Sequence, residues 1–316
     1  MGIKNLKKVI EKYAPTSIKC TTISEYRNKV LGIDFSLMLY KMVYAIRYNG
    51  YDIKNNNIIV THLHALLLKM RGFIKYNIIP VFVFDGIPPK IKEDTLNKRK
   101  EFQKIMSLKY HKAVTQDEKK KYYFMKSGIT HEEVIECMEL IKIFGYTVIE
   151  SLEEADSQLA DLIKKGKIDY VVTDDMDILI FGGNKILKNF TVSDKKKIQE
   201  INLDIIKKET NLNQSQLVDL GILLGCDYCP SIKGIGPIGA YDLIQKYKTL
   251  DEIFKKENIT LSYNYESARN YFNNSPTINS STIKINKKNI NKKELIIFLK
   301  KYNYEDKYIY SLLSKL

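Results

Sequence analysis

Several features that are common in secreted and membrane proteins are missing from this sequence. Its 316 residues include only four cysteines, too few for the disulfide framework of a secreted domain. No apolar run approaches the ~18 residues that a membrane-spanning helix needs. The start of the chain alternates Lys with apolar residues and does not have the pattern of a signal peptide. We therefore expect an intracellular protein that does not enter a membrane.

Familiar catalytic signatures are also missing. The phosphate-binding loop GxxxxGK[ST] does not occur, and no set of Ser, His and Asp indicates a nucleophilic triad. His62 and His64 are two positions apart on a predicted helix, so they face different ways and do not form a ligand pair. Cys226 and Cys229 form one CxxC pair without a second, which disfavours a structural zinc site.

Acidic residues are outnumbered by basic ones, at 37 against 51, which gives a formal net charge of +14. Such an excess favours a polyanionic partner, with nucleic acid first and an anionic membrane surface second. Solubility alone is the alternative explanation of the charge. Because 44% of the residues are hydrophobic, the chain can still bury a core.

The acids that are present gather where apolar runs end. Four such runs predict buried strands that lead into Asp or Glu, at residues 29–36, 78–86, 146–151 and 170–172. Ligands bind at the carboxyl ends of strands in open α/β sheets, and clustered oxygen ligands suit Mg²⁺ or Mn²⁺. The alternatives are that Glu153, Glu154 and Asp156 only stabilise a helix start, and that Asp174 is a surface or capping residue.

The remaining pattern predicts an α/β fold with a mostly parallel central sheet flanked by helices. We expect residues 29–36 to form the first strand, residues 52–57 a polar loop, and residues 258–293 an irregular segment. Ser127 or Thr130 is expected to cap the helix that follows. Helices are predicted at residues 1–13, 37–48, 58–76, 130–144, 203–225, 241–247 and, as a final pair, 294–316.

Residues 90–126 differ from the rest in charge. They contain twelve Lys or Arg against five acids, a net +7 that is half the charge of the chain, and no Gly or Pro. We interpret them as one or two helices that extend from the domain, and an ordinary solvated hairpin is the alternative.

A glycine-rich turn follows at residues 234–240 (GIGPIGA). Such a turn before a helix favours a phosphate at backbone N–H groups, whatever the base sequence. The alternatives are that these glycines only allow two helices to pack, and that Asp227 before them only forms a turn.

These motifs resemble, in order, those of flap endonucleases of the XPG nuclease superfamily. The resemblance rests on MGIKNL, the strand that ends in Asp34, and the segments VFVFDGIPP, EEAD, TDDMDILIFG and LLGCDYCPSIKGIGPIGA. It extends from residue 1 to about residue 254 and becomes loose from Asn258 onward. It implies the PIN-like nuclease fold, in which an α/β domain carries a helical arch and a helix-two-turn-helix DNA-binding element.

The resemblance also implies how the chain is divided. A single nuclease domain would span residues 1–316, with an N-terminal XPG region at 1–105 and the arch at 90–130. An internal XPG region at 130–255 would contain the helix-two-turn-helix at about 220–250. A divergent C-terminal segment at 256–316 would pack back on the core.

A metal centre of two Mg²⁺ ions, for which Mn²⁺ can substitute, is a further implication of the resemblance. Its carboxylate ligands would be Asp34, Asp85, Glu154, Asp156, Asp175, Asp177 and Asp227. Asp175 and Asp177 are also assigned as catalytic. Asp156 stands where related eukaryotic enzymes carry Glu, and its shorter side chain is expected to loosen or redirect that ligand.

The resemblance implies DNA contacts as well. Lys92 and Arg99 match a basic pair at the base of the arch, assigned as catalytic, and the arch would thread a 5′ single strand. Tyr40 would stack on a base, and the region of Arg47 would recognise a 3′ flap. The predicted DNA-binding residues are Gly2, Tyr40, Arg47, Lys69, Lys92, Arg99, Gly234, Gly236 and Gly239, the glycine turn often with K⁺.

By resemblance, the protein is a structure-specific 5′-flap endonuclease, also active as a 5′ exonuclease, in DNA replication and repair. A 5′–3′ exonuclease or a junction-cutting member of the superfamily is the main alternative, and a non-catalytic DNA-binding scaffold is a weaker one. We expect a monomer at the nucleus or another site of DNA replication. The chain lacks the usual Gln-containing tail, so the partner status of a sliding clamp stays open.

Overall fold

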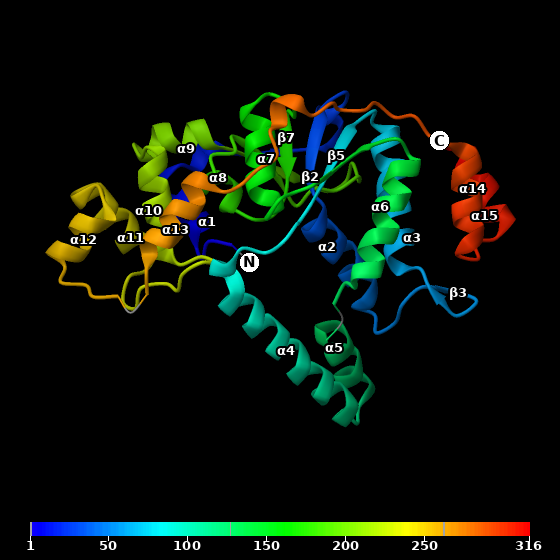
Figure 1. Ribbon diagram of the computed structural model, residues 1–316, viewed down its shortest axis with the longest axis horizontal. Coiled ribbons are helices and arrows are strands. Elements are labelled where there is room, and N and C mark those ends of the chain that lie inside the picture. Colours follow the sequence, from blue (N-terminus) through cyan, green and yellow to red (C-terminus); the bar gives the residue numbers. More distant parts are fainter. Residues whose placement is uncertain (1, 127, 262) are drawn as a thin grey trace.

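A seven-stranded sheet forms the centre of the protein (Figure 1). The computed structural model describes residues 2–126, 128–261 and 263–316. Across the sheet the strand order is β1-β9-β8-β7-β2-β5-β6. The strands are Ile18–Thr21 (β1), Val30–Asp34 (β2), Ile79–Phe84 (β5), Thr147–Glu150 (β6), Tyr170–Val172 (β7), Lys185–Lys188 (β8) and Ile198–Asn202 (β9). From β8 to β6 neighbouring strands run parallel, whereas β9 is antiparallel to both β8 and β1. The mostly parallel α/β sheet that we predicted is therefore confirmed.

The helices lie around this sheet in chain order. The first group is Leu6–Tyr13 (α1), Phe35–Arg47 (α2), Thr61–Lys75 (α3), Glu93–Lys112 (α4), Gln116–Lys126 (α5), His131–Ile143 (α6), Ala155–Lys164 (α7) and Asp177–Ile180 (α8). The second group is Leu203–Thr210 (α9), Gln214–Leu224 (α10), Pro237–Tyr247 (α11), Leu250–Lys256 (α12), Tyr265–Asn274 (α13), Lys292–Lys301 (α14) and Asp306–Leu313 (α15). Thr130 caps α6 as predicted, whereas Ser127 lies outside the described residues.

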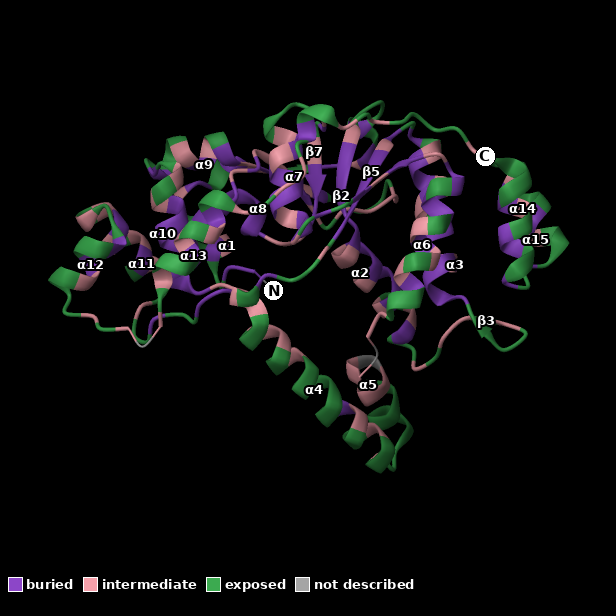
Figure 2. Ribbon diagram, viewed as in Figure 1, coloured by how far each residue is buried: buried purple, intermediate pink, exposed green. Residues whose placement is uncertain are grey.

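Each face of the sheet has its own hydrophobic core, because alternate strand residues point to opposite faces. In β5, Val81 and Val83 belong to one core, and Phe82 and Phe84 belong to the other. The first core includes residues of α1 and α7–α13, and the second includes residues of α2, α3, α6, α14 and α15. Figure 2 shows the resulting buried strands and the exposed outer sides of the helices. Among the described residues, no helix is both long and apolar enough to cross a membrane.

The sequence-based prediction missed several short elements. The strand at residues 29–36 is second in chain order, after β1, and β8 and β9 were not predicted. The predicted loop at 52–57 contains β3 (Lys54–Asn55), which pairs with β4 (Ile58–Ile59). These strands mix polar with apolar residues over two to five positions, so no continuous apolar run marks them.

The prediction that residues 258–293 are irregular is partly wrong, because α13 lies within them. Asn264 caps this helix, and Ala268 and Phe272, four residues apart, are buried against the core. Arg269 on the same helix pairs with buried Asp219 of α10 at 3.0 Å. One apolar pair and one ion pair are thus enough to dock this polar stretch on the domain.

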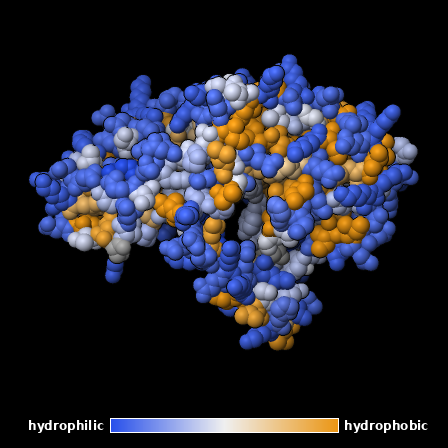
Figure 3. Space-filling model, in the orientation of Figure 1, coloured by the Kyte–Doolittle hydropathy of each residue, from blue (hydrophilic) through white to orange (hydrophobic). Residues whose placement is uncertain are grey.

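The basic segment predicted to extend from the domain forms α4 and α5, which pack against each other below the body (Figure 1). Met106 is the one buried residue of α4. In Figure 3 the surface of this arch is mainly hydrophilic, and the molecule is hollowed between the arch and the body above it. The fold therefore places a basic, solvated arch below the carboxyl edge of the sheet.

A buried ionic cluster fixes the second arch helix to the body. Arg47, at the end of α2, is 5% exposed and donates to Asp52 at 2.8 Å and to Glu133 of α6 at 2.7 Å. It also donates to the carbonyl oxygen of Gly128 at 2.7 Å. Tyr123 of α5 donates to the second oxygen of Asp52. The Arg47 guanidinium is therefore enclosed by protein groups where α2, α6 and the end of the arch meet.

We predict that Arg47→Ala destabilises the protein strongly, because it leaves the Asp52 and Glu133 carboxylates in a buried site without their cation. The expected loss is about 3–5 kcal/mol of unfolding free energy, measured by urea denaturation. Lys301→Ala is the control, since Lys301 and Glu139 form an exposed pair that is worth at most about 1 kcal/mol. Equal losses in the two variants would contradict the structural role of Arg47.

Candidate metal centre and nucleic-acid interface

The first two carboxylates are placed by neighbouring parallel strands. Asp34 ends β2 and caps α2, accepting hydrogen bonds from the Leu37 N–H at 3.1 Å and the Thr173 hydroxyl at 2.9 Å. Asp85 follows β5 directly and accepts from the N–H of Ala155 at 2.9 Å. Because β2 and β5 pair in parallel, both side chains lie at the same edge of the sheet.

The start of α7 supplies the next pair. Glu154 is the N-cap of this helix and Asp156 lies in its first turn. Two residues at these positions would diverge in the middle of a helix, so their joint use depends on the helix start that the structure contains. One Asp156 oxygen, Oδ1, is buried and has no hydrogen-bond partner. An unsatisfied buried oxygen is what an oxygen ligand awaiting a cation looks like.

Asp175 and Asp177 lie in the turn from β7 into α8, against the start of the chain. The N–H of Ile3 donates to Asp177 at 2.8 Å, and the N–H of Asp177 donates to Asp175 at 3.1 Å. A Cβ on Gly2 would lie 1.7 Å from Oδ1 of Asp175, so only glycine fits at this place. The structure thus brings Gly2 to these two predicted ligands.

The seventh carboxylate, Asp227, meets the base of the arch. It follows α10 and accepts from the guanidinium of Arg99 at 2.6 Å, with the ammonium of Lys92 at 3.2 Å. Lys92 is also paired with Glu154, and the hydroxyl of Tyr228 donates to the other oxygen of Glu154. The predicted basic pair therefore lies among the predicted metal ligands, held by two of them.

Crowding of acids changes their protonation. Burial, followed by the charge of Asp85, raises the pKa of Asp34 to about 7. Burial also raises the pKa of Asp156 and of Asp177 well above the usual range, with further contributions from neighbouring carboxylates. Burial alone lowers the pKa of Lys92, but Glu154 and Asp227 outweigh it and raise that pKa. The site accordingly favours protons or other cations on its carboxylates.

The donor set fits divalent cations. All seven predicted ligands are carboxylates, the hard oxygen donors that Mg²⁺ and Mn²⁺ prefer. The unpartnered Oδ1 of Asp156 and the raised pKa values of three members are further signs of missing positive charge. Within the described ranges no three acid, His or Cys side chains are already close enough together to enclose an ion. The carboxylates thus converge without forming a finished cage.

The remaining predicted DNA contacts differ in exposure. Tyr40 of α2 is half-buried and stacks on Tyr44, with 4.0 Å between ring centroids. Lys69 of α3 lines a small cleft that reaches Asp34, where burial lowers its pKa to about 8. The prediction for Arg47 needs correction, since its guanidinium is buried and bound to protein groups. It positions the arch and does not present a free cation to DNA.

The three glycines of the predicted phosphate-binding turn are exposed, at positions Gly234, Gly236 and Gly239. Gly236 caps α11, and Gly234 has a φ of +87°, which favours glycine. A Cβ on any of the three would meet nothing within 4 Å, so the alternative of close helix packing does not explain them.

Two residues near the site were missed or left undefined by sequence reasoning. Tyr228 was not assigned, although it lies beside Asp227 inside the motif LLGCDYCP. Its buried ring and its bond to Glu154 depend on tertiary contacts that the motif does not reveal. Asp174, interpreted as a surface or capping residue, is half-buried, paired with Lys41 and bonded to the N–H of Asn189 at 2.6 Å.

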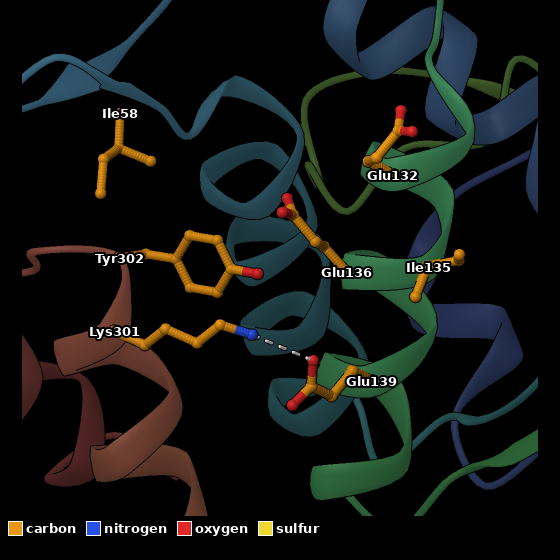
Figure 4. Close-up of a pocket in the computed structure, with 7 residues that line it drawn as sticks. All are labelled: Ile58, Glu132, Ile135, Glu136, Glu139, Lys301 and Tyr302. Carbon is orange, nitrogen blue, oxygen red and sulfur yellow. Dashed lines mark ion pairs between the residues drawn. The ribbon is translucent and has the colours of Figure 1, made fainter.

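A separate hollow of about 440 Å³ lies between α6, α14 and β4 (Figure 4). Figure 4 shows Glu132, Ile135, Glu136 and Glu139 on one side and Lys301 and Tyr302 on the other, with Lys301 paired to Glu139. No predicted site residue lines this hollow, and its acids do not face the seven carboxylates. The candidate site is therefore the strand edge and not this cavity.

We predict that Asp34→Asn stabilises the metal-free protein at high pH. Because folding raises the pKa of Asp34 from 3.8 to about 7, the folded state holds a proton that the unfolded chain releases between these values. Stability conferred by that proton is present below pH 4 and is lost as the pH rises to about 7. In EDTA the variant should exceed the parent by on the order of 2 kcal/mol at pH 8 and match it near pH 4. The exposed Asp94→Asn is the control, and identical pH profiles for Asp34→Asn and the parent would contradict the prediction.

Two family models match the sequence. The XPG N-terminal domain matches residues 1–105, and the XPG I-region matches residues 145–227. The flap endonuclease 1 of Nematostella vectensis is 36% identical over 313 residues, covering 95% of this chain and 82% of that protein. The flap endonuclease 1 of Entamoeba dispar is 36% identical over 287 residues, covering 86% and 75% respectively.

Solved structures agree with the sequence relatives. The flap endonuclease-1 of Methanococcus jannaschii matches with a TM-score of 0.74 at 25% identity, covering 97% of this chain and 96% of that one. The catalytic core of Rad2 in complex with DNA substrate matches with a TM-score of 0.75 at 19% identity over the full length of both, which shows a common fold. The chain therefore belongs to the flap endonuclease family of XPG-type nucleases.

Proposed function

We propose that this protein is a structure-specific 5′-flap endonuclease, a hydrolase that cleaves DNA where a single-stranded 5′ arm joins duplex. The observation that carries this function is the meeting of the strand-end carboxylates with the base of a basic arch, through Lys92, Arg99, Glu154 and Asp227. Membership of the flap endonuclease family supports it over most of the chain. Replication and repair of DNA are the processes that such an activity serves.

Nucleases of this family depend on metal ions. We infer two Mg²⁺ ions, for which Mn²⁺ can substitute, held by the seven carboxylates named above. When bound, the ions activate water and stabilise charge on the attacking and leaving oxygens of the phosphodiester. The buried, proton-binding state of Asp34 and Asp177 supports this assignment, because such groups exchange protons for a cation.

The chain's own cations complete the site. Lys92 and Arg99 are held beside the carboxylates by Glu154 and Asp227, and the same groups can contact the reacting phosphate as its charge increases. Tyr40, half-buried on α2, offers a ring on which a base next to that phosphate can stack. Asp175 and Asp177, fixed against Gly2 and Ile3, keep their carboxylates directed to the site.

Selection of substrate rests on structure and not on base sequence. We infer that the arch at residues 90–130 threads the 5′ single strand, because its two helices carry a net positive charge and stand in solvent. The exposed turn with Gly234, Gly236 and Gly239 at the start of α11 would hold duplex phosphates, with K⁺ as a further ligand. Lys69 and Gly2 would lie at the edge of the same DNA path.

The extent of these regions is part of the proposal. A single nuclease domain would combine the N-terminal region, the arch and the internal region with its helix-two-turn-helix at about 220–250, and the segment 256–316 would pack on the core. The protein acts on DNA, and we place it in the nucleus or at another site of replication. A monomer suffices, because every proposed site residue comes from one chain.

The test is cleavage of labelled 5′-flap, nicked and four-way DNA with Mg²⁺ and with EDTA. We predict cleavage at the base of the flap that requires the metal, with shorter products from the nicked end and little cutting of the four-way junction. Products from the nicked end alone would favour a 5′ exonuclease, and preference for the four-way DNA would favour a junction-cutting enzyme. No cleavage of any substrate would leave a DNA-binding scaffold and overturn the proposal.

Asp175→Ala separates chemistry from binding. We predict that it abolishes flap cleavage and leaves flap affinity within a few-fold, because the lost carboxylate acts on the metal ions and not on the duplex. Affinity is measured by fluorescence anisotropy in Ca²⁺. A fall in affinity as large as the fall in cleavage would count against a catalytic role.

Lys92→Ala and Arg99→Ala test the basic pair. Single-turnover cleavage of bound flap should slow by about 10²–10³-fold, while affinity changes much less, because their charge is needed most as the phosphate reacts. Lys100→Ala, an exposed lysine on the same helix, is the matched control and should leave the single-turnover rate near that of the parent. Similar slowing in the control would show that the arch acts only through its overall charge.

A further inference from the structure

The CxxC pair is the one motif of the site region that the proposed function leaves without a role. Cys226 and Cys229 stand on either side of Asp227 and Tyr228, and both are free thiols. Their sulfur atoms are 3.5 Å apart. The N–H of Cys226 donates to the carbonyl oxygen of Cys229 at 3.0 Å, so the backbone already closes a four-residue turn. The two thiols are thus in contact before any reaction.

The ends of this turn have little freedom to move. The carbonyl oxygen of Gly225 accepts from the N–H of Lys4 at 3.1 Å. Gly225 itself has a φ of +84°, and a Cβ on it would lie 2.4 Å from the backbone N of Ser231. A disulfide has an S–S distance of ~2.05 Å, so bond formation draws the two sulfurs together by roughly 1.5 Å. With the flanks fixed, the residues between the cysteines must absorb much of that movement.

Those two residues hold the site together. Asp227 is a proposed metal ligand, pairs with Arg99, and accepts from the Thr95 hydroxyl at its carbonyl oxygen at 2.8 Å. Tyr228 donates to Glu154, a second proposed ligand. A change in the turn therefore reaches two carboxylates and the base of the arch at once.

We propose that Cys226 and Cys229 are a modification site, where a small-molecule disulfide such as oxidised glutathione forms a reversible Cys226–Cys229 disulfide that displaces Asp227 and Tyr228 and lowers metal binding and cleavage. The inference rests on the proposed function for its activity readout. The chemical modification itself does not depend on that function.

The exchange balances in two steps. The sulfur of Cys226, which is partly exposed, bonds to one sulfur of the small disulfide and releases the first small thiol. The buried sulfur of Cys229 then bonds to Cys226 and releases the second small thiol. Two electrons pass from the protein thiols to the small disulfide, and the two thiol protons end on the released thiols. An excess of a reducing dithiol reverses both steps.

The other two cysteines provide controls. Cys20 is exposed on β1, far in the sheet order from the strands that carry the ligands, and Cys137 is buried in α6. Cys20 can form a mixed disulfide but has no thiol partner among the interactions of the described residues. Modification at Cys20 therefore adds glutathione mass, whereas the Cys226–Cys229 bond removes the mass of two hydrogen atoms.

The experiment treats the full-length protein with oxidised glutathione and follows three readouts. Trypsin releases both cysteines in one peptide, residues 209–233, which should lose the mass of two hydrogen atoms. Mn²⁺ affinity, measured by electron paramagnetic resonance, and flap cleavage should each fall by about tenfold or more. Dithiothreitol should restore the mass, the affinity and the cleavage.

Variants assign the effect to the pair. Cys226→Ser and Cys229→Ser should each keep Mn²⁺ affinity and cleavage after oxidation, because neither can form the bond. Cys20→Ser should stay as sensitive as the parent. Equal sensitivity in Cys226→Ser would overturn the inference, as would a fully formed disulfide that leaves Mn²⁺ affinity and cleavage unchanged, or a peptide that never loses the two hydrogen atoms.

Failure of the proposed function is distinguishable from failure of this inference. A reduced protein that never cleaves flap DNA would reject the function alone. In that case peptide mass and Mn²⁺ affinity still decide whether the disulfide forms and whether it reaches the metal ligands.

Discussion

Repulsion among carboxylates held at one edge of a sheet shapes the rest of this structure. Asp34 and Asp177 are buried, and their neighbours raise their pKa values further. Such a group is tolerable only when positive charge is supplied nearby. Within the chain that charge comes from Lys92 and Arg99, which pair with Glu154 and Asp227. The acidic edge and the basic arch therefore stabilise each other, and the net charge of +14 surrounds an acidic centre without contradiction.

The same pairing couples the arch to the chemistry. α4 begins next to the carboxylates, and the far end of the arch is held to the body by the buried cluster around Arg47. Both feet of the arch thus rest on ionic contacts, while most of its length is exposed. A cation or a phosphate that enters the site must compete for Lys92 and Arg99, so occupancy of the site and the position of the arch base depend on the same few bonds.

Much of this arrangement could be predicted from sequence where the signal is local. The apolar runs that end in Asp34, Asp85 and Asp175 gave the sheet edge, because parallel strands place their carboxyl ends together. A capping residue marked the start of α6. Signals were absent where pairing is distant. β8 and β9 are short and mixed in polarity, α13 docks through two apolar residues and one ion pair, and Arg47 finds Glu133 far along the chain. No local pattern reports such contacts.

The central claim is that the carboxylates converge to bind divalent cations at the foot of the arch. Anomalous diffraction from crystals soaked in Mn²⁺ tests it most directly. The account predicts strong Mn²⁺ peaks among Asp34, Asp85, Asp175 and Asp177. Soaked crystals in which these side chains stay apart and ion-free would contradict it.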